Sequence, residues 1–149
     1  MKFVKTETMA EAEVRVVLEH WANAVRSRDI HGIVAHYAPD IVAFDAIAQL
    51  QFKGLEAYRK HWEYCLTLCN GPTIFDAHEI KISANDELAF AYGLCLCGGT
   101  NDKGEQQSGW MRFTAAFRKL DGQWRTVHEH WSTPFDMESG KALLDLKPE

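Results

Sequence analysis

The chain has no run of basic residues: its 16 Lys and Arg are outnumbered by 21 Asp and Glu, for a formal net charge of −5. Nucleic acids and anionic membrane surfaces attract clustered cations, so neither is an expected partner. No apolar stretch approaches the roughly 20 residues of a membrane-spanning helix. The start of the chain, MKFVKTETMAEAEV, has no apolar core and no small-residue cleavage pattern of a signal peptide. We therefore expect a cytoplasmic protein.

Familiar catalytic motifs are also missing. No glycine-rich nucleotide loop follows a strand, and no Ser-His-Asp or Cys-His motif is recognisable. We expect no cofactor. The four cysteines (Cys65, Cys69, Cys95 and Cys97) lie in regular elements, without the turns that a tetracysteine zinc site needs between its ligands. They are expected to be reduced thiols that behave as small buried hydrophobes.

Aromatic residues, by contrast, are plentiful: five Trp, eight Phe and four Tyr in 149 residues. Either the core is unusually bulky or rings line an apolar cavity. The length is that of one domain. We expect a single domain over 1–149, with a core at about 8–135 and a loosely attached tail at 136–149.

Three helices are predicted in the first half. Thr8 and Glu11 form a capping box at the start of the first helix, which then carries an apolar stripe. Asp29 can cap a second, shorter helix that ends before the letters APD. The third helix has apolar residues at helical spacing between Leu55 and Cys69 and ends at NGP. The first stripe consists of Val14, Val17, Leu18, Trp21 and Val25.

Strands dominate the remainder. The run IVAFDA predicts a strand that ends at Asp45, and four long strands follow the third helix: TIFDAHEIKIS, ELAFAYGLCLC, SGWMRFTAAFRKL and QWRTVHEHWS. Short turn-forming segments separate them, as in an antiparallel meander. Helices followed by such a meander predict an α+β fold in which helices cover one face of a sheet.

The faces of two strands predict how that sheet packs. In SGWMRFTAAFRKL, one face carries Met111, Phe113, Ala115 and Phe117. In ELAFAYGLCLC, large residues alternate with small ones, and we expect the large set to face the helices. The small set would then lie on the outer face and allow close packing in a homodimer. The large set is Leu88, Phe90, Tyr92, Leu94 and Leu96, and the small set is Ala89, Ala91, Gly93, Cys95 and Cys97.

The run HEHWSTPF, from His128 to Phe135, is chemically the richest stretch. Strand alternation places His128 and His130 on one face, with Trp124 and Thr126, and Glu129 and Trp131 on the other, with Val127. The two histidines could chelate a metal with further ligands, but two hydrogen-bonded histidines are the simpler interpretation, and we expect no required metal. Hairpin register decides which face points inward, and the sequence does not fix that register.

Three segments together resemble a known family: LEHWANAVRSRDIHGIVAHYAPDIVAFD, FKGLEAYRKHW and RKLDGQWRTVHEHWSTPF. In order and spacing they are similar to the SnoaL-like, ketosteroid isomerase-like branch of the nuclear transport factor 2-like superfamily. The resemblance implies a cone-shaped, curved antiparallel (mixed) sheet wrapped around three N-terminal helices, with a pocket in its open end. It places Asp45 at the position of a proton-shuttling aspartate, Trp21 at that of an oxyanion-hole tyrosine and Trp131 at that of a pocket-wall tryptophan. It thereby favours Glu129 and Trp131 facing inward.

Two departures argue against a steroid isomerase of the usual design. The strand MRFTAAF lacks the carboxylate that would form the second half of the oxyanion hole. Trp21 stands in place of the oxyanion-hole tyrosine. Asp45 has two interpretations, a turn cap in solvent or a general acid/base in an apolar cavity. Glu129 is either paired with Arg125 or Arg112, or a second acid/base group.

The resulting functional expectation is a pocket for a small apolar or partly polar organic molecule. Asp45 and Glu129 are the candidate catalytic residues in a cofactor-free isomerisation, cyclisation or dehydration. The alternative is a ligand-binding or oligomerisation module without catalysis, because this fold serves many functions. The candidate pocket residues are Trp21, Tyr58, Trp62, Phe90, Tyr92, Met111, Phe113 and Trp131.

Overall fold

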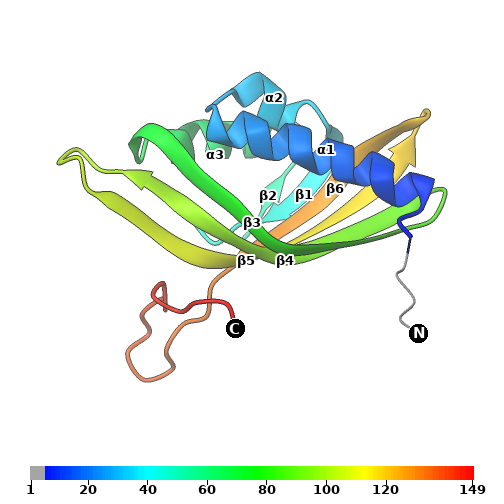
Figure 1. Ribbon diagram of the computed structural model, residues 1–149. Coiled ribbons are helices and arrows are strands. Elements are labelled where there is room, and N and C mark those ends of the chain that lie inside the picture. Colours follow the sequence, from blue (N-terminus) through cyan, green and yellow to red (C-terminus); the bar gives the residue numbers. More distant parts are fainter. Residues whose placement is uncertain (1–5) are drawn as a thin grey trace.

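One curved sheet and three helices make up the structure, a computed structural model that describes residues 6–149 apart from the side chain of Asn70. Figure 1 shows the helices over the concave face of the sheet and the C-terminal tail beyond the opposite face. The strand order is β2-β1-β6-β5-β4-β3, with β1 and β6 parallel and the other pairs antiparallel. This confirms the predicted α+β arrangement. The elements are α1 (Met9–Arg26), α2 (Ile30–Val34), β1 (Tyr37–Phe44), β2 (Phe52–Lys53), α3 (Leu55–Leu66), β3 (Asn70–Ala84), β4 (Leu88–Thr100), β5 (Gln106–Leu120) and β6 (Gln123–Ser132).

Helix α1 begins at the predicted cap and buries the predicted stripe. The Thr8 hydroxyl oxygen accepts a hydrogen bond from the Glu11 backbone N–H at 3.1 Å. Trp21 packs at the centre of the core, where its ring stacks on Phe113 with the centroids 5.3 Å apart. The apolar stripe of α1 thus packs against aromatic side chains on the concave face of the sheet.

The segment between α1 and α3 differs in detail from the prediction. Helix α2 ends at Val34, and Tyr37, expected on that helix, is the first residue of β1. The two-residue strand β2 was not predicted. Helix α3 begins directly after Gly54. The φ of +90° at this position is one that glycine adopts more readily than other residues. Strand β1 stops one residue before Asp45, which leaves that side chain at the rim of the sheet.

The predicted faces of β4 are wrong. Ala89 and Ala91 are buried, whereas Phe90 and Tyr92 are 48% and 47% exposed on the outer face. The reason is register. Ala91 lies opposite Ala115 of β5, and cross-strand partners share a face, so the correctly predicted core face of β5 draws the small residues of β4 inward.

A bulge in β6 changes its alternation. Thr126 lies opposite Phe117, but His128 lies opposite the preceding residue of β5, Ala116, which leaves Val127 as an extra residue. Trp124 and Thr126, expected beside the histidines, are therefore buried with Glu129 and Trp131. His128 and His130 point away from the core, where the rings of both contact Phe44.

The tail after β6 lies against the outer face of the sheet. A methyl group on Gly109 of β5 would sit 3.1 Å from the carbonyl oxygen of Leu144 in the tail. Other tail residues are open to solvent, including Met137 at 84% exposure. Across the residues described, no helix is long and apolar enough to cross a membrane.

Candidate functional site

A cavity of about 270 Å³ lies between α3 and the sheet. Helix α3 contributes one wall, and strands β3 to β6 contribute the facing one. Most lining side chains are aliphatic or carry sulfur, and Trp62, Phe75 and Trp131 supply the indole and phenyl rings, so the wall is less aromatic than expected. The lining residues are Val25, Arg28, Asp45, Ile47, His61, Trp62, Cys65, Leu66, Leu68, Cys69, Thr73, Ile74, Phe75, Cys97, Gly98, Met111 and Trp131.

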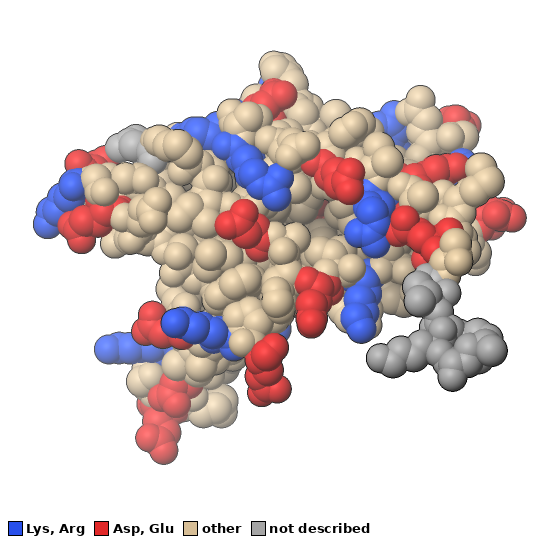
Figure 2. Space-filling model, in the orientation of Figure 1, with Lys and Arg blue, Asp and Glu red and all other residues tan. Residues whose placement is uncertain are grey.

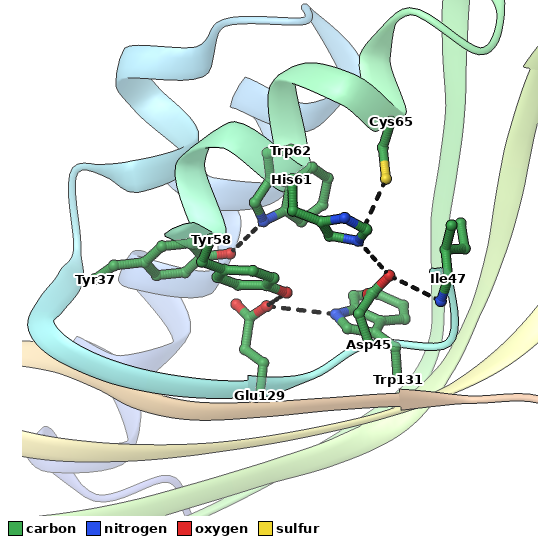
Figure 3. Close-up of polar contacts among 9 residues, drawn as sticks. All are labelled: Tyr37, Asp45, Ile47, Tyr58, His61, Trp62, Cys65, Glu129 and Trp131. Carbon is green, nitrogen blue, oxygen red and sulfur yellow. Dashed lines mark hydrogen bonds and ion pairs between the residues drawn. The ribbon is translucent and has the colours of Figure 1, made fainter. Parts of the chain in front are cut away.

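A carboxylate and an imidazole meet in this wall. Asp45 follows the end of β1, and His61 comes from the middle of α3. Asp45 Oδ2 and His61 Nε2 are 2.7 Å apart, and the side chains are only 13% and 4% exposed (Figure 3). The backbone N–H of Ile47 donates to the same oxygen at 3.2 Å, and the His61 ring stacks on Phe52. Both members of the pair are held in place from two sides.

Cys65 lies one helical turn after His61 and completes a cluster of three. Its Sγ is 3.5 Å from His61 Nε2, the nitrogen that also contacts Asp45 (Figure 3). Burial, and then the nearby Asp45 charge, raise the pKa of the Cys65 thiol to about 12. The thiol is therefore protonated at neutral pH and is a poor nucleophile.

Glu129 lies behind the cavity in a buried network, at 2% exposure. The Tyr58 hydroxyl donates to Glu129 Oε2 at 2.7 Å, and the Trp131 indole N–H approaches the same oxygen at 3.4 Å. The Tyr37 hydroxyl also acts on this carboxylate and lowers the pKa of Glu129. The Tyr37 hydroxyl in turn accepts the indole N–H groups of Trp21 at 3.0 Å and Trp62 at 3.1 Å.

Burial raises the pKa of Glu129 to about 7, because a charged carboxylate loses its hydration there. The polar side-chain groups of Tyr58, Tyr37 and Trp131 oppose this rise in pKa, and the Asp45 charge adds to it. The arginine partners suggested by the sequence are wrong. Arg125 donates instead to the carbonyl of Ala35 and the side chain of Gln123, and Arg112 to the hydroxyl of Ser132.

The structure divides the sequence-predicted site residues into three groups. Asp45, Trp62, Met111 and Trp131 line the cavity. Behind the cavity wall lie Trp21, Tyr58, Phe113 and Glu129, all buried. The prediction that Phe90 and Tyr92 line the pocket is wrong. The register of β4 places both on the outer face of the sheet, away from the cavity.

Sequence reasoning missed two members of the cavity wall. His61 stands four residues before Cys65, a spacing that puts both on one face of a helix and could have marked them as a pair. Arg28 has a φ of +60° at the end of α1. Its guanidinium donates to the carbonyls of Cys69 at 3.0 Å, Gly71 at 3.3 Å and Leu66, which ties the end of α3 to the end of α1.

Comparison with known proteins identifies the family. The SnoaL-like domain family matches residues 14–136, and the chain belongs to that family. An NTF2-like protein of unknown function from Pseudomonas putida KT2440 is 53% identical over 93% of this chain and 96% of its own, with a TM-score of 0.86. No curated protein matches the chain. The resemblance inferred from the sequence is therefore confirmed.

More distant structures share the fold. A ketosteroid isomerase-like protein from Erwinia carotovora atroseptica SCRI1043 has 17% identity and a TM-score of 0.69, over 82% of this chain and 94% of its own. The association domain of C. elegans CaMKII has 16% identity and a TM-score of 0.67, over the same shares of the two chains. At 16% and 17% sequence identity, the similarity of these structures shows a shared fold.

Proposed function

We propose that the cavity binds a small, largely apolar organic molecule and that Asp45 transfers a proton on it, in a cofactor-free isomerisation, cyclisation or dehydration. One observation carries the proposal: Asp45 and His61 form a 2.7 Å pair in the wall of a cavity that is otherwise mainly apolar. Membership of a family whose fold accommodates ligand-binding and isomerase-type proteins agrees with it.

The size and walls of the cavity restrict the ligand. Its volume of about 270 Å³ is at the lower end of the range of roughly 300–1,000 Å³ for drug-sized ligands. One ring or a short branched chain fits such a space better than a fused polycycle. Trp62 and Trp131 provide flat surfaces for a ring, and the guanidinium of Arg28 lies in the same wall.

The proposed chemistry divides the work between the two members of the pair. His61 orients the carboxylate by contacting Asp45 Oδ2, together with the Ile47 N–H, and leaves Oδ1 for the ligand. Asp45 takes a proton from a carbon next to a carbonyl and returns it elsewhere on the molecule. The indole N–H groups of Trp62 and Trp131 already contact Tyr37 and Glu129, and the Arg28 guanidinium donates to three backbone carbonyls. Arg28 would therefore act on a developing oxyanion through its positive charge.

Proton exchange provides the test. The protein is incubated in D₂O with a panel of small cyclic ketones and enones, and NMR follows deuterium incorporation next to the carbonyl. We expect Asp45→Asn to lower the exchange rate by roughly 100-fold or more, the usual effect of losing a general acid/base. Asp86→Asn, which alters an exposed aspartate in the turn between β3 and β4, is the matched control. Equal exchange by wild type and Asp45→Asn would exclude Asp45 as the base.

A second candidate function is self-association through the outer face of the sheet. The specific observation is the row of large apolar side chains on β4: Leu88, Phe90 and Tyr92 are about half exposed. Such a row is costly in water unless something covers it, and a second copy of the chain brings an identical row. One distant relative in fold is named an association domain, which agrees with assembly by this architecture.

A further inference from the structure

We propose that Asp45, His61 and Cys65 form a binding site for a divalent transition metal, with Zn²⁺ as the best fit. Each side chain offers one ligand atom, and the three atoms lie within 4.8 Å of one another. The site goes beyond the proposed proton transfer and does not depend on it. It also differs from the His128–His130 pair considered from the sequence, which points away from the core.

The contacts converge on one atom. Asp45 Oδ2 and Cys65 Sγ both approach His61 Nε2, at 2.7 and 3.5 Å. In a thiol–imidazole–carboxylate relay, the thiol and the acid would contact opposite nitrogens of the ring. Here both lie near the same nitrogen, so the three potential ligand atoms cluster on one side of the ring, as a metal site requires.

One of the ligand-to-ligand distances already matches a tetrahedral zinc site, and the others require side-chain rotation. Zinc–ligand bonds of about 2.0–2.3 Å place the nitrogen and the sulfur about 3.6 Å apart and the nitrogen and the oxygen about 3.4 Å apart. The observed nitrogen–sulfur distance of 3.5 Å already matches. The oxygen, now hydrogen-bonded at 2.7 Å, would move away from the nitrogen. The oxygen and the sulfur, which lie within 4.8 Å of each other, would come to about 3.5 Å, so metal binding requires rotation of the Asp45 and Cys65 side chains.

The donor set selects the kind of metal. A thiolate, an imidazole and a carboxylate suit zinc and its neighbours in the first transition row, whereas magnesium and calcium prefer oxygen ligands alone. When zinc binds, the Cys65 thiol releases its proton to solvent, and the thiolate and the carboxylate together balance the two positive charges. The site would thus be close to neutral, as a buried position requires.

The cavity gives the site an open position. Asp45, His61 and Cys65 all line the cavity. Three protein ligands plus one position that faces a ligand space is the pattern of zinc sites that bind exchangeable molecules. Metal binding would compete with the proposed proton transfer, because a carboxylate that binds a metal through Oδ2 is a weaker base at Oδ1.

Cobalt provides a spectroscopic test that is independent of activity. Reduced, metal-stripped full-length protein is titrated with Co²⁺, and absorption is recorded. We expect one equivalent to produce a near-ultraviolet thiolate-to-cobalt band and visible bands of tetrahedral cobalt, both lost when Zn²⁺ is added. Cys65→Ser should abolish the thiolate band, and His61→Gln should weaken cobalt binding by at least about tenfold.

The matched control is Cys69→Ser, four residues further along, after the end of α3, and in the same cavity wall but outside the cluster of three. It should bind cobalt like the wild type, and circular dichroism establishes that each variant is folded. The absence of both bands in the wild type, or a thiolate band that survives Cys65→Ser, would overturn the proposal. If any proton exchange is found, zinc should inhibit it. If the protein catalyses no proton exchange but gives the cobalt bands, the proton-transfer proposal fails and the metal site is still supported.

Discussion

Glu129 is a buried carboxylate that the fold surrounds with neutral donors. Tyr58 and Trp131 form hydrogen bonds with it, the Tyr37 hydroxyl lowers its pKa, and no described Lys or Arg pairs with it. Neutral donors replace part of the lost hydration, but they do not cancel the cost of burying a charge. The protonated form of Glu129 is therefore favoured up to about neutral pH.

This environment predicts a pH-dependent stability. The folded-state pKa of about 7 lies above the ordinary value of 4.5. The contribution of Glu129 to stability is thus full below pH 4.5 and is lost as the pH rises through 7. The difference corresponds to about 3 kcal/mol. Urea unfolding at pH 5, 6.5 and 8 measures it: Glu129→Gln, a neutral isostere, should remove most of the fall in unfolding free energy seen in the wild type over this range.

A carboxylate in solvent is the control for that experiment. Glu138 lies in the exposed part of the tail, and Glu138→Gln should leave the pH dependence of the wild type unchanged. If Glu129→Gln shows the same slope with pH as the wild type, other groups cause the dependence, and Glu129 is not the buried acid described above.

For single residues, the sequence identifies candidate site residues better than it identifies the side chains that they contact. Asp45 and Glu129 were singled out from strand patterns and from the family resemblance. The partner of Asp45 is His61, sixteen residues away on α3, and the main donor to Glu129 is Tyr58, seventy-one residues away. No local pattern encodes such pairs, because tertiary packing creates them. The catalytic roles of Asp45 and Glu129 stay predictions.

Among the elements, those with strong periodicity were predictable. The strand expected at QWRTVHEHWS has the bounds observed for β6, and the helix starting after Thr8 is α1. Strand β2 has only two residues, too few to show an alternation of apolar and polar side chains. The inward face of β4 was mispredicted because register, set by the pairing of Ala91 with Ala115, outweighs the preference of large apolar residues for the core.

The cap of α1 gives a prediction at the scale of an element. Thr8→Ala removes the hydroxyl oxygen that accepts the Glu11 N–H. We expect a loss of about 1 kcal/mol in unfolding free energy, measured by urea denaturation. Thr6→Ala, two residues earlier and exposed, should change it by less than about 0.5 kcal/mol. Equal effects of the two variants would mean that the cap contributes nothing.

The outer face of the sheet belongs to the scale of the whole molecule. Figure 2 shows acidic and basic side chains interspersed over the face in view, without a large patch of one sign. On the outer face of the sheet, the apolar side chains of Leu88, Phe90 and Tyr92 are about half exposed. This makes association through β4 the natural form of assembly to test.

Light scattering after size-exclusion chromatography tests that association. The chain has a mass of 17.0 kDa, and we expect about twice this value for the wild type at tens of micromolar. Phe90→Glu should shift the mass toward that of one chain, because it buries a charge in the interface. Leu50→Glu, at a site that is 92% exposed and remote from β4 in sequence, should not. A wild type that has the mass of one chain excludes the dimer.

The pairing of β1 with β6 has a consequence for the order in which contacts form. Strands β3 to β6 are joined by short turns and can pair early, whereas the pairing of β1 with β6 brings Val42 together with His128, eighty-six residues further along. Closing so long a loop costs more chain entropy than forming any hairpin in the sheet. Asp45 directly follows β1, so it meets the cavity wall formed by β3 to β6 only when that late strand docks. Closure of the cavity during refolding would therefore report the completion of the fold, and a destabilised β1 would remove the site while leaving the four-stranded meander paired.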